Sequence, residues 1–184
     1  MRIDNMARGN SVYTSNAYLV RGDWNALGDR NTLVDTGRDP VVLANLERTA
    51  TGVGKPRVEQ VVLTHCHYDH LGMLERIRQR HRPMVYAFSP HLAGVDRVLE
   101  DGDRLLLGDS WFEVIHVPCH SQDSVCLYQP DHGVLFSGDN PVEPHQGLSS
   151  RSCDCGEISS RLSQLAIHMI YPGHGGAYRT ARPN

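Results

Sequence analysis

The chain has 184 residues, of which 40% are hydrophobic and 21% charged, and its formal net charge is −3 at pH 7. This length and balance are typical of a soluble globular domain with a substantial core, and no apolar run approaches the roughly 18 residues that a membrane span needs. The basic residues are scattered, so nothing indicates a phosphate-binding face or a nucleic-acid partner. We therefore predict one domain over residues 1–184 with neither a membrane nor a nucleic acid as partner, and we leave the oligomeric state open.

Cysteine usage and the N-terminal residues both favour the cytoplasm. The five cysteines are an odd number, so they cannot all pair within one chain, and unpaired thiols are typical of a reducing compartment. Residues 1–6 lack the basic segment and the apolar stretch of a secretory signal. We therefore predict a cytoplasmic protein with reduced cysteines.

In the first half of the chain, short apolar runs alternate with helical spacing. Strands are predicted over residues 16–20, 32–34, 61–63 and 84–88. A helix is predicted over 41–51, because Pro40 precedes apolar residues at positions 42, 43 and 46. A second helix is predicted from Asp69 to about Arg80, where apolar residues at 71, 74 and 77 follow helical spacing.

The second half of the chain is richer in strands. They are predicted over residues 105–107, 111–117, 124–128, 134–136 and 169–171, with Gly, Asp and Pro in the turns. One helix is predicted over 158–165. Strands with interleaved helices indicate an α/β fold, and this pattern fits two sheets as well as one.

A His-x-His-x-Asp-His sequence occupies residues 65–70, directly after a predicted buried strand and at the start of a predicted helix. Imidazole and carboxylate groups are the usual ligands of zinc and similar divalent ions. His65 and His67 alternate along an extended loop, so both side chains can point to one side. Asp69 and His70 follow at the helix start and could aim at a second ion. The spacing therefore predicts a metal site.

Three more residues of the same chemical kind each follow a predicted strand later in the chain. His120 comes after the strand at 111–117, Asp139 follows a Ser-Gly pair, and His174 lies in a Pro-Gly-His-Gly turn. Catalytic groups are frequently carried by loops on a rigid strand scaffold. We therefore expect these three side chains to join residues 65–70 at one edge of a sheet.

This ordered set of motifs resembles the metallo-β-lactamase superfamily. The sequence Leu-Val-Asp-Thr-Gly at residues 33–37 is similar to another motif of that family, and the resemblance spans about residues 17–176. It implies an αββα sandwich, in which two packed β-sheets have helices outside and the functional site lies at one edge.

The resemblance also implies a role for each of these residues. By analogy, His65, His67 and His120 would bind a first metal ion, Asp69, His70 and His174 would bind a second, and Asp139 would bridge the two. Asp35 would brace the metal-binding loop without being a ligand itself. The implied cofactor is a pair of divalent metal ions, for which zinc is favoured and iron or manganese are alternatives.

Two features depart from the family pattern. The family usually continues Asp-His-x-Gly-Gly, whereas Met73 stands here at the second glycine. Cys66 lies between two expected ligands and Cys119 lies beside a third, and a thiolate can itself bind zinc. We expect both thiols to point away into the core, because cysteine behaves as a small and frequently buried apolar residue.

The implied chemistry is metal-dependent hydrolysis. Two neighbouring divalent ions can share a water and lower its pKa until hydroxide forms near neutral pH. The expected reaction is attack of this metal-bridging hydroxide on a small thioester, lactone or other ester-like substrate. Asp69 is the expected catalytic residue, because a carboxylate beside the hydroxide can orient it and accept its proton.

Several activities within the family remain open. Asp139 argues against a true β-lactamase, because the lactam-cleaving branches generally lack that residue. Hydroxyacylglutathione hydrolases share these motifs but add a C-terminal helical domain, which we do not expect because only residues 177–184 follow the last motif. We favour a small thioesterase or lactonase-like hydrolase. The alternatives are a persulfide dioxygenase with a single iron, a phosphodiesterase, and a non-catalytic metal-binding member.

The segment from Pro141 to Gly156 lies between two expected ligands, is rich in Gly, Ser and Pro, and has no clear periodicity. We predict that it covers or borders the substrate pocket, and His145 is a candidate proton donor there. Cys153 and Cys155 form a Cys-x-Cys pair that could be an accessory metal site or a redox site. Without a second such pair, a loop over the site is the favoured interpretation.

Overall fold

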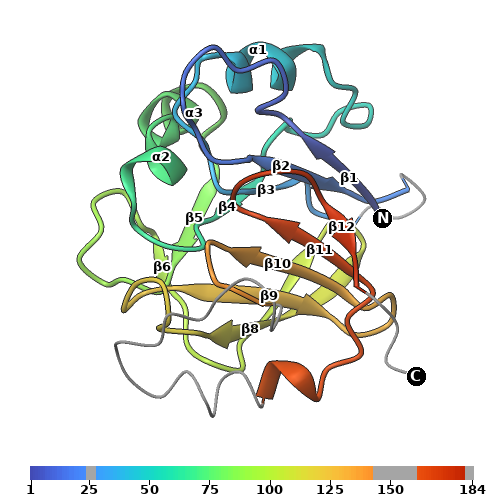
Figure 1. The fold of residues 1–184 in the computed structure, drawn as a ribbon. Helices are drawn as coiled ribbons and strands as arrows, with labels where there is room; N and C mark the ends of the chain where they lie inside the picture. Colours follow the sequence, from blue (N-terminus) through green and yellow to red (C-terminus); the bar gives the residue numbers. More distant parts are fainter. Residues whose placement is uncertain (24–27, 143–160, 181–184) are drawn as a thin grey trace.

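Two six-stranded sheets, formed by the described residues, make up the framework of the protein (Figure 1). The computed structural model describes residues 1–23, 28–142 and 161–180. The strand order is β1-β2-β3-β4-β5-β6 in the first sheet and β12-β11-β10-β9-β8-β7 in the second. The chain therefore completes one sheet before it begins the other, and each half of the sequence builds one layer.

The first sheet carries the helices that the structure describes in full. Its strands are β1 (Arg2–Asn5), β2 (Tyr18–Arg21), β3 (Thr32–Val34), β4 (Gln60–Val62), β5 (Met84–Ala87) and β6 (Arg97–Val98). The first three are antiparallel, and β3 to β6 are parallel. Parallel neighbours need crossover connections. The connection from β3 to β4 contains α1 (Val41–Arg48). The connection from β4 to β5 contains α2 (Tyr68–Leu71) and α3 (Leu74–His81).

The second sheet is mostly antiparallel. Its strands are β7 (Arg104–Leu107), β8 (Ser110–His116), β9 (Val125–Gln129), β10 (Val134–Gly138), β11 (Met169–Pro172) and β12 (Tyr178–Arg179). Among the described residues of this second sheet, only the pair of β10 and β11 is parallel. The segment that connects these two strands includes a helical stretch at residues 161–163, on the side away from α1 to α3 (Figure 1).

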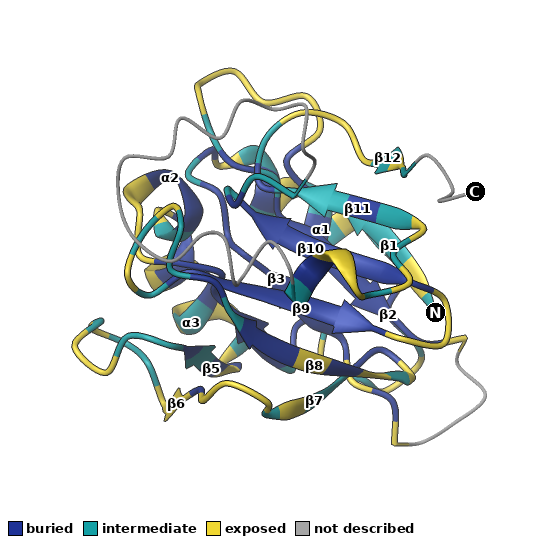
Figure 2. Cartoon of the chain, turned by 60° about the horizontal axis from the view of Figure 1, so that its bottom comes forward, coloured by how far each residue is buried: buried dark blue, intermediate teal, exposed yellow. Residues whose placement is uncertain are grey.

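Three layers of apolar side chains hold the sheets and helices together. In β2, Leu19 packs in the core beneath the helices, whereas its neighbours Tyr18 and Val20 pack in the core between the sheets. In β8, Val114 belongs to the core between the sheets and Ile115 to an outer cluster that includes Leu162. Successive strand residues point to opposite faces, so the central strands are buried on both sides (Figure 2). The predicted αββα sandwich is therefore confirmed.

The strands that the sequence did not reveal lie at or near sheet edges. β1 has Ile3 as its one apolar residue, and β6 and β12 have two residues each. Edge strands are frequently short and polar, which limits pairing with other chains. Their stability comes from a neighbouring strand rather than from burial of their own side chains, so they leave no apolar pattern.

The helix predicted from Asp69 to about Arg80 is in fact two helices, separated at Gly72 and Met73. Backbone groups that a continuous helix would use internally are bound by other segments. The carbonyl of Asp69 accepts from the amide of Ser15, and the carbonyl of His70 accepts from the amide and hydroxyl of Thr36. The break therefore results from tertiary hydrogen bonds that fix the segment carrying both residues.

Two other predicted helices are shorter than expected where the structure describes them. α1 ends at Arg48 rather than at position 51, because Thr49 has an extended backbone. In the helix predicted over 158–165, the helical conformation ends at residue 163, and residues 158–160 lie outside the described part. Within the described ranges, no helix combines the length and apolar character needed to cross a membrane.

Candidate metal centre

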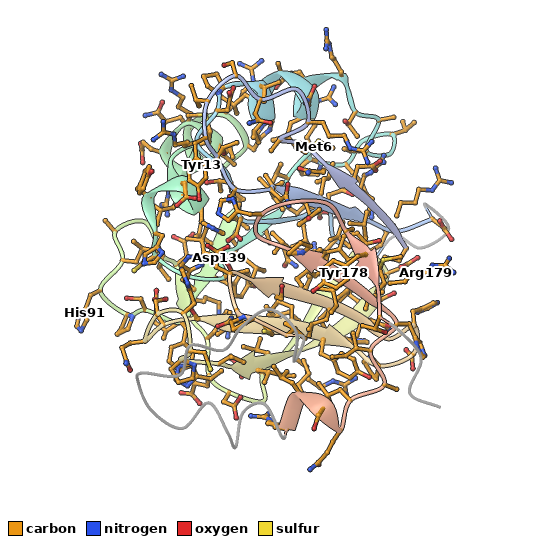
Figure 3. All side chains as sticks on the ribbon, viewed as in Figure 1. Met6, Tyr13, His91, Asp139, Tyr178 and Arg179 are labelled. Atoms are coloured by element: carbon orange, nitrogen blue, oxygen red, sulfur yellow. The ribbon has the colours of Figure 1, made fainter. Side chains whose placement is uncertain are left out.

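All seven predicted ligands come together where strands of both sheets end. Residues 65–70 follow β4 of the first sheet, and His120, Asp139 and His174 follow β8, β10 and β11 of the second. Figure 3 places Asp139 between the two sheets, beyond the end of β10. The site therefore lies on an edge shared by two sheets, not on the edge of one.

The seven side chains form three overlapping groups. Within each group, one potential ligand atom per residue lies within 4.8 Å of the others. The groups are His65, His67 and His120; His65, His70 and Asp139; and Asp69, His70 and His174. His65 and His70 each belong to two groups, so the groups form one continuous cluster rather than separate sites.

Asp139 lies at the middle of this cluster. Its Oδ1 is 3.3 Å from Nε2 of His70, and its Oδ2 is 3.6 Å from Nε2 of His120 and 3.4 Å from Nε2 of His174. The carboxylate thus contacts histidines from both predicted ligand sets. This is the position that a bridging ligand would take.

Two further contacts connect the outer members of the cluster. Nδ1 of His67 lies 2.9 Å from Nε2 of His120, and Oδ2 of Asp69 lies 3.1 Å from Nε2 of His174. Each contact joins a residue of the 65–70 segment to a residue of the second sheet. The cluster is therefore assembled across the interface between the sheets.

Three polar atoms of the cluster are buried and make no well-aligned hydrogen bond: Nε2 of His65, Nε2 of His70 and Oδ1 of Asp139. The last two face each other as an ion pair at 3.3 Å. Buried polar groups are nearly always hydrogen-bonded, so such exceptions need an explanation. Imidazole nitrogen and carboxylate oxygen are the donors that divalent transition-metal ions prefer. The donor set and its unsatisfied atoms therefore fit a divalent metal centre, while the assignment of each ligand stays a prediction.

Asp35 braces this centre from the loop after β3. Its carboxylate accepts hydrogen bonds from the amide and the hydroxyl of Thr64, each at 2.8 Å, and lies 2.8 Å from Nδ1 of His70. Asp35 has a φ of 55°, a left-handed conformation that few residues other than glycine tolerate and that Asp and Asn adopt most readily. The backbone thus adopts an unfavourable conformation that aims the carboxylate at His70.

Burial and the neighbouring carboxylates act in opposite directions on the pKa values of His65 and His70. Burial opposes a charge on His70, but Asp35 and Asp139 outweigh it and raise the pKa of His70 to about 10. At His65 burial dominates, followed by repulsion from His70, and the pKa falls to about 4. Burial would also raise the pKa of Asp139, but His174 and His70 lower it well below its usual range. The centre is therefore a buried carboxylate site that requires positive charge, which divalent cations can supply.

Two glycines whose role the sequence analysis missed keep space open beside the ligands. A Cβ at position 173 would lie 2.1 Å from Oδ1 of Asp139 and 2.7 Å from Cε1 of His70. A Cβ at Gly138 would lie 2.8 Å from the Thr64 hydroxyl, and Gly138 has a φ of +53°. Each glycine directly precedes an expected ligand in a Ser-Gly-Asp or Pro-Gly-His motif, so the motifs marked both positions. The need for glycine could not be predicted, because the side chains that an added Cβ would meet are distant in the sequence.

The prediction that both cysteines near the ligands point into the core is wrong for Cys66. This residue is exposed, because it alternates with the inward-facing His65 on a loop that has already left the sheet. Burial of the thiol and then the neighbouring Asp123 carboxylate raise the pKa of Cys66. Cys119 is partly buried and packs against the outer cluster of the second sheet, as expected.

A hollow of about 270 Å³ opens directly beside the centre. Its lining includes the ligands His120, Asp139 and His174, together with Asn140 and Tyr178. It lies on the second-sheet side of the cluster, at the ends of β10 and β11. The hollow offers room for a small molecule to approach the ligands.

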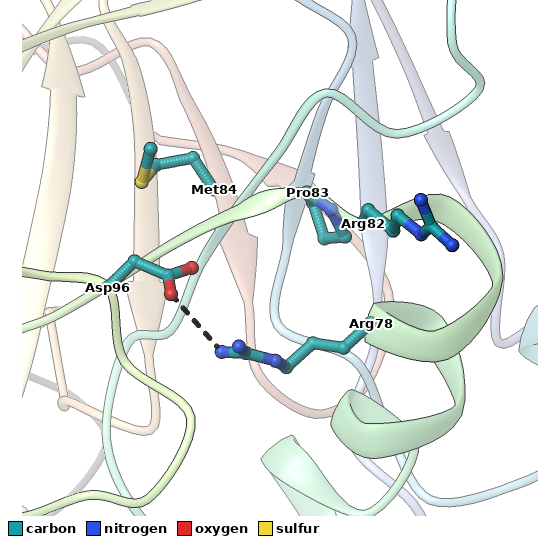
Figure 4. A pocket seen from close by; sticks show the side chains of 5 residues that line it. All are labelled: Arg78, Arg82, Pro83, Met84 and Asp96. Carbon is teal, nitrogen blue, oxygen red and sulfur yellow. Dashed lines mark ion pairs between the residues drawn. The ribbon is translucent and has the colours of Figure 1, made fainter.

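Two other hollows among the described residues contain no candidate ligand. One, of about 340 Å³, lies between α3 and β5 (Figure 4). Arg78 and Asp96 form an ion pair of 3.5 Å there, and both side chains are about one-third exposed, so the pair contributes little. The other, of about 680 Å³, contains Lys55 and Arg57, whose charged groups already bind Asp29 and backbone carbonyls. Neither hollow competes with the metal centre as a functional site.

Most of the predicted pocket-covering segment lies outside the residues that the structure describes. Pro141 and Val142 are described, but residues 143–160 are not. The candidate proton donor His145 and the pair Cys153 and Cys155 therefore lie outside the described residues. Their proposed roles stay predictions.

With this geometry established, comparison with known proteins identifies the family. A family model described as "Metallo-beta-lactamase superfamily" matches residues 11–93 and 88–181. The chain belongs to the metallo-beta-lactamase superfamily. The resemblance inferred from the motifs is thereby confirmed.

Relatives of this chain include proteins named as a thioesterase and as a hydroxyacylglutathione hydrolase. The chain is 26% identical over 213 residues to "Acyl-coenzyme A thioesterase MBLAC2" of Gallus gallus, with 91% of this chain and 75% of that protein covered. It is 31% identical over 124 residues to "Hydroxyacylglutathione hydrolase" of Chromohalobacter salexigens, with 66% of this chain but only 46% of that protein covered. The prediction of a metal-dependent hydrolase agrees with these names.

A solved structure shares the architecture over nearly its whole length. The structure titled "Crystal structure of TTHA1623 in a di-iron-bound form" is 25% identical to this chain and has a TM-score of 0.70. The match covers 97% of this chain and 94% of that chain. The two packed sheets and flanking helices described above are therefore the fold of this superfamily.

Proposed function

We propose that this chain is a thioesterase that hydrolyses a small thioester at a centre of two divalent metal ions. The observation that carries the proposal is the convergence of seven His and Asp side chains with three buried ligand atoms that make no well-aligned hydrogen bond. The thioesterase and hydroxyacylglutathione hydrolase names of the relatives support the choice of a thioester.

The proposed ligands divide as the family resemblance implies. His65, His67 and His120 would hold one ion, Asp69, His70 and His174 the other, and Asp139 both. The di-iron form of TTHA1623 supports a site for two ions, and we propose zinc, with iron and manganese as alternatives. When bound, such ions lower the pKa of a water and polarise a substrate carbonyl.

Asp69 is the proposed catalytic residue. The residue is 5% exposed, and its carboxylate oxygen Oδ2 lies 3.1 Å from Nε2 of His174 and 3.9 Å from Nε2 of His70. A carboxylate held this close to the ligand cluster can orient the attacking water and accept its proton. The same proton can then pass to the departing sulfur.

The leaving group explains why a thioester suits this site. An ordinary thiol has a pKa of about 8.5, so a thiolate leaves with little help from a general acid, whereas an amide nitrogen must be protonated. The hollow of about 270 Å³ beside His120 and His174 has room for a small acyl group. The larger thiol part of the substrate would extend over the surface.

The test is a substrate panel with the full chain after loading with zinc. Acetyl-coenzyme A, an acylglutathione, a simple lactone and a nitrophenyl phosphodiester would be compared. We expect the thioesters to be hydrolysed fastest, and Asp69→Asn to lower kcat by about 10²- to 10⁴-fold, as for loss of a general base. Asp131→Asn, in an exposed turn, is the matched control and should match the wild type. Undiminished turnover by Asp69→Asn would contradict the assigned role.

We also propose that the protein is cytoplasmic and that its residues form a single domain. Cys66 and Cys126 are free thiols, which accords with the predicted cytoplasmic location. We likewise retain residues 1–184 as a single domain that acts on a small molecule. Fractionation of cells that express the natural gene would test the location.

A further inference from the structure

Tyr13 is an exposed aromatic residue that lies against the metal centre. Its side chain is 63% exposed, although its ring stacks on that of His174 with centroids 5.1 Å apart and an angle of 18° between planes. Its hydroxyl lies 3.4 Å from Nε2 of His174. In Figure 3, Tyr13 is on the same side of the molecule as Asp139. A phenol is therefore held at the open side of the cluster.

The loop that carries Tyr13 is fixed on both sides of this residue. Before it, the carboxylate of Asp39 accepts hydrogen bonds from the amides of Ser11 and Val12, at 2.6 and 3.1 Å. After it, the hydroxyl of Thr14 accepts from the amide of Arg38 at 2.8 Å. These bonds anchor the loop to the turn that begins α1.

The same loop is also bonded to the ligand segments themselves. The amide of Ser15 donates to the carbonyl of Asp69 at 3.3 Å, and the amide of Asn16 donates to the carbonyl of Gly173 at 2.7 Å. The position of Tyr13 is thus set relative to both Asp69 and His174. The backbone on both sides of Tyr13 is therefore held in place, and such preorganisation is what a catalytic donor requires.

Nε2 of His174 cannot accept a hydrogen bond from the Tyr13 hydroxyl while its lone pair binds a metal ion. It is the atom that approaches Asp69 at 3.1 Å and Asp139 at 3.4 Å, and it is the proposed metal-binding atom. When its lone pair binds a cation, the Tyr13 hydroxyl must direct its proton to another acceptor at the same face. A substrate carbonyl that enters the centre brings such an acceptor.

We propose that Tyr13 is a catalytic residue whose hydroxyl donates a hydrogen bond to the carbonyl oxygen of the thioester. This inference rests on the proposed thioesterase function. As the water oxygen bonds to the carbonyl carbon, its proton passes to Asp69 and the carbonyl π electrons move to oxygen, where the Tyr13 hydroxyl stabilises the negative charge. The C–S bond then breaks, the carbonyl reforms, and the sulfur takes the proton from Asp69. The products are a carboxylic acid and a thiol.

A pair of substitutions separates this role from simple support of His174. Tyr13→Phe removes only the hydroxyl and keeps the stacked ring, whereas Tyr13→Ala removes both. Loss of one oxyanion donor typically lowers kcat by about 10²- to 10³-fold, so Tyr13→Phe should lose at least about tenfold in kcat at unchanged zinc content. Tyr86→Phe, which removes a phenol hydroxyl from β5 in the first sheet, should match the wild type.

A binding measurement gives a second readout that does not depend on turnover. Butylphosphonate is a tetrahedral oxyanion, and its Kd for the zinc-loaded protein can be measured by calorimetry. We expect Tyr13→Phe to weaken this Kd at least about tenfold, which corresponds to the loss of one hydrogen bond to a charged group. Zinc affinity, measured by chelator competition, should be unchanged.

The outcomes distinguish the two proposals. An active wild type with an equally active Tyr13→Phe, and a weakened Tyr13→Ala, would overturn the catalytic role and leave the ring as a support for His174. A wild type that binds zinc but hydrolyses none of the thioesters would overturn the proposed function itself. Reduced turnover and phosphonate binding in Tyr13→Phe, at unchanged zinc affinity, would support both.

Discussion

The two sheets supply ligands to the same centre in different ways. The first sheet contributes His65, His67, Asp69 and His70, all from the segment that follows the single strand β4. The second contributes one residue after each of three strands, namely His120, Asp139 and His174. One half of the centre is therefore a local sequence motif, and the other half exists only because the sheet aligns the ends of β8, β10 and β11.

The two halves are also braced differently. On the first-sheet side, the strained Asp35 uses its carboxylate to hold Thr64 and His70. On the second-sheet side, Gly138 and Gly173 provide space by lacking a side chain. The local motif is thus oriented by hydrogen bonds to Asp35. The ligands from separate strands depend on glycines that let the backbone come close to neighbouring side chains. The predictions below test this difference.

The largest effect is expected from Gly173→Ala. The added methyl group would lie 2.1 Å from Oδ1 of Asp139 and 2.7 Å from Cε1 of His70, so the central carboxylate must move. A misplacement of about 1 Å at a reacting centre can cost about 10²-fold in rate. We therefore expect at least that loss of activity together with less than the full metal content. Gly176→Ala, where a Cβ meets nothing within 4 Å, is the control, and equal activity of the two variants would refute the role of Gly173.

A smaller effect is expected from Asp35→Asn. Asparagine keeps the size of the side chain and tolerates the φ of 55°, but it removes the charge that faces His70. Loss of such an outer partner typically weakens metal affinity by about 10- to 100-fold, which chelator competition can measure. Asp29→Asn removes another buried carboxylate, one that pairs with Lys55, and should leave the affinity unchanged. Wild-type affinity in Asp35→Asn would show that the local motif needs no brace.

The smallest effect is expected on stability, at Asp39, whose carboxylate binds the backbone of the loop that carries Tyr13. Hydrogen bonds from the amides of Val41, Ser11 and Val12 lower the pKa of Asp39 to about 2, below its ordinary value of about 3.9. The folded state therefore favours the carboxylate, and this stabilisation is present above about pH 4 and is lost as the pH falls towards 2. The difference in unfolding free energy between wild type and Asp39→Asn, measured without metal, should shrink over that range. A difference that does not change with pH would contradict the assignment.

The strands with a run of apolar residues could be predicted from the sequence. The ligands could also be predicted where they lie close together in the sequence or belong to a motif. The central strands are buried on both faces, so their runs were readable, and residues 65–70 contained four expected ligands in order. The break at Gly72 and Met73 was not predictable, because it depends on hydrogen bonds from Ser15 and Thr36. The exposure of Cys66 depends on where the loop leaves the sheet. Tyr13 was missed for the same reason, since only the folded loop brings it to His174.

The central claim is that both halves contribute to one centre of two metal ions. The most direct test is the metal content of the full chain, measured by plasma mass spectrometry after equilibrium dialysis against zinc, for the wild type and for His120→Ala. We predict two zinc ions per wild-type chain and about one for His120→Ala, because this variant keeps the second proposed ligand set intact. A single iron in the untreated protein, with oxygen consumption on a persulfide, would favour the dioxygenase alternative. One zinc ion or none per wild-type chain would contradict the two-metal centre.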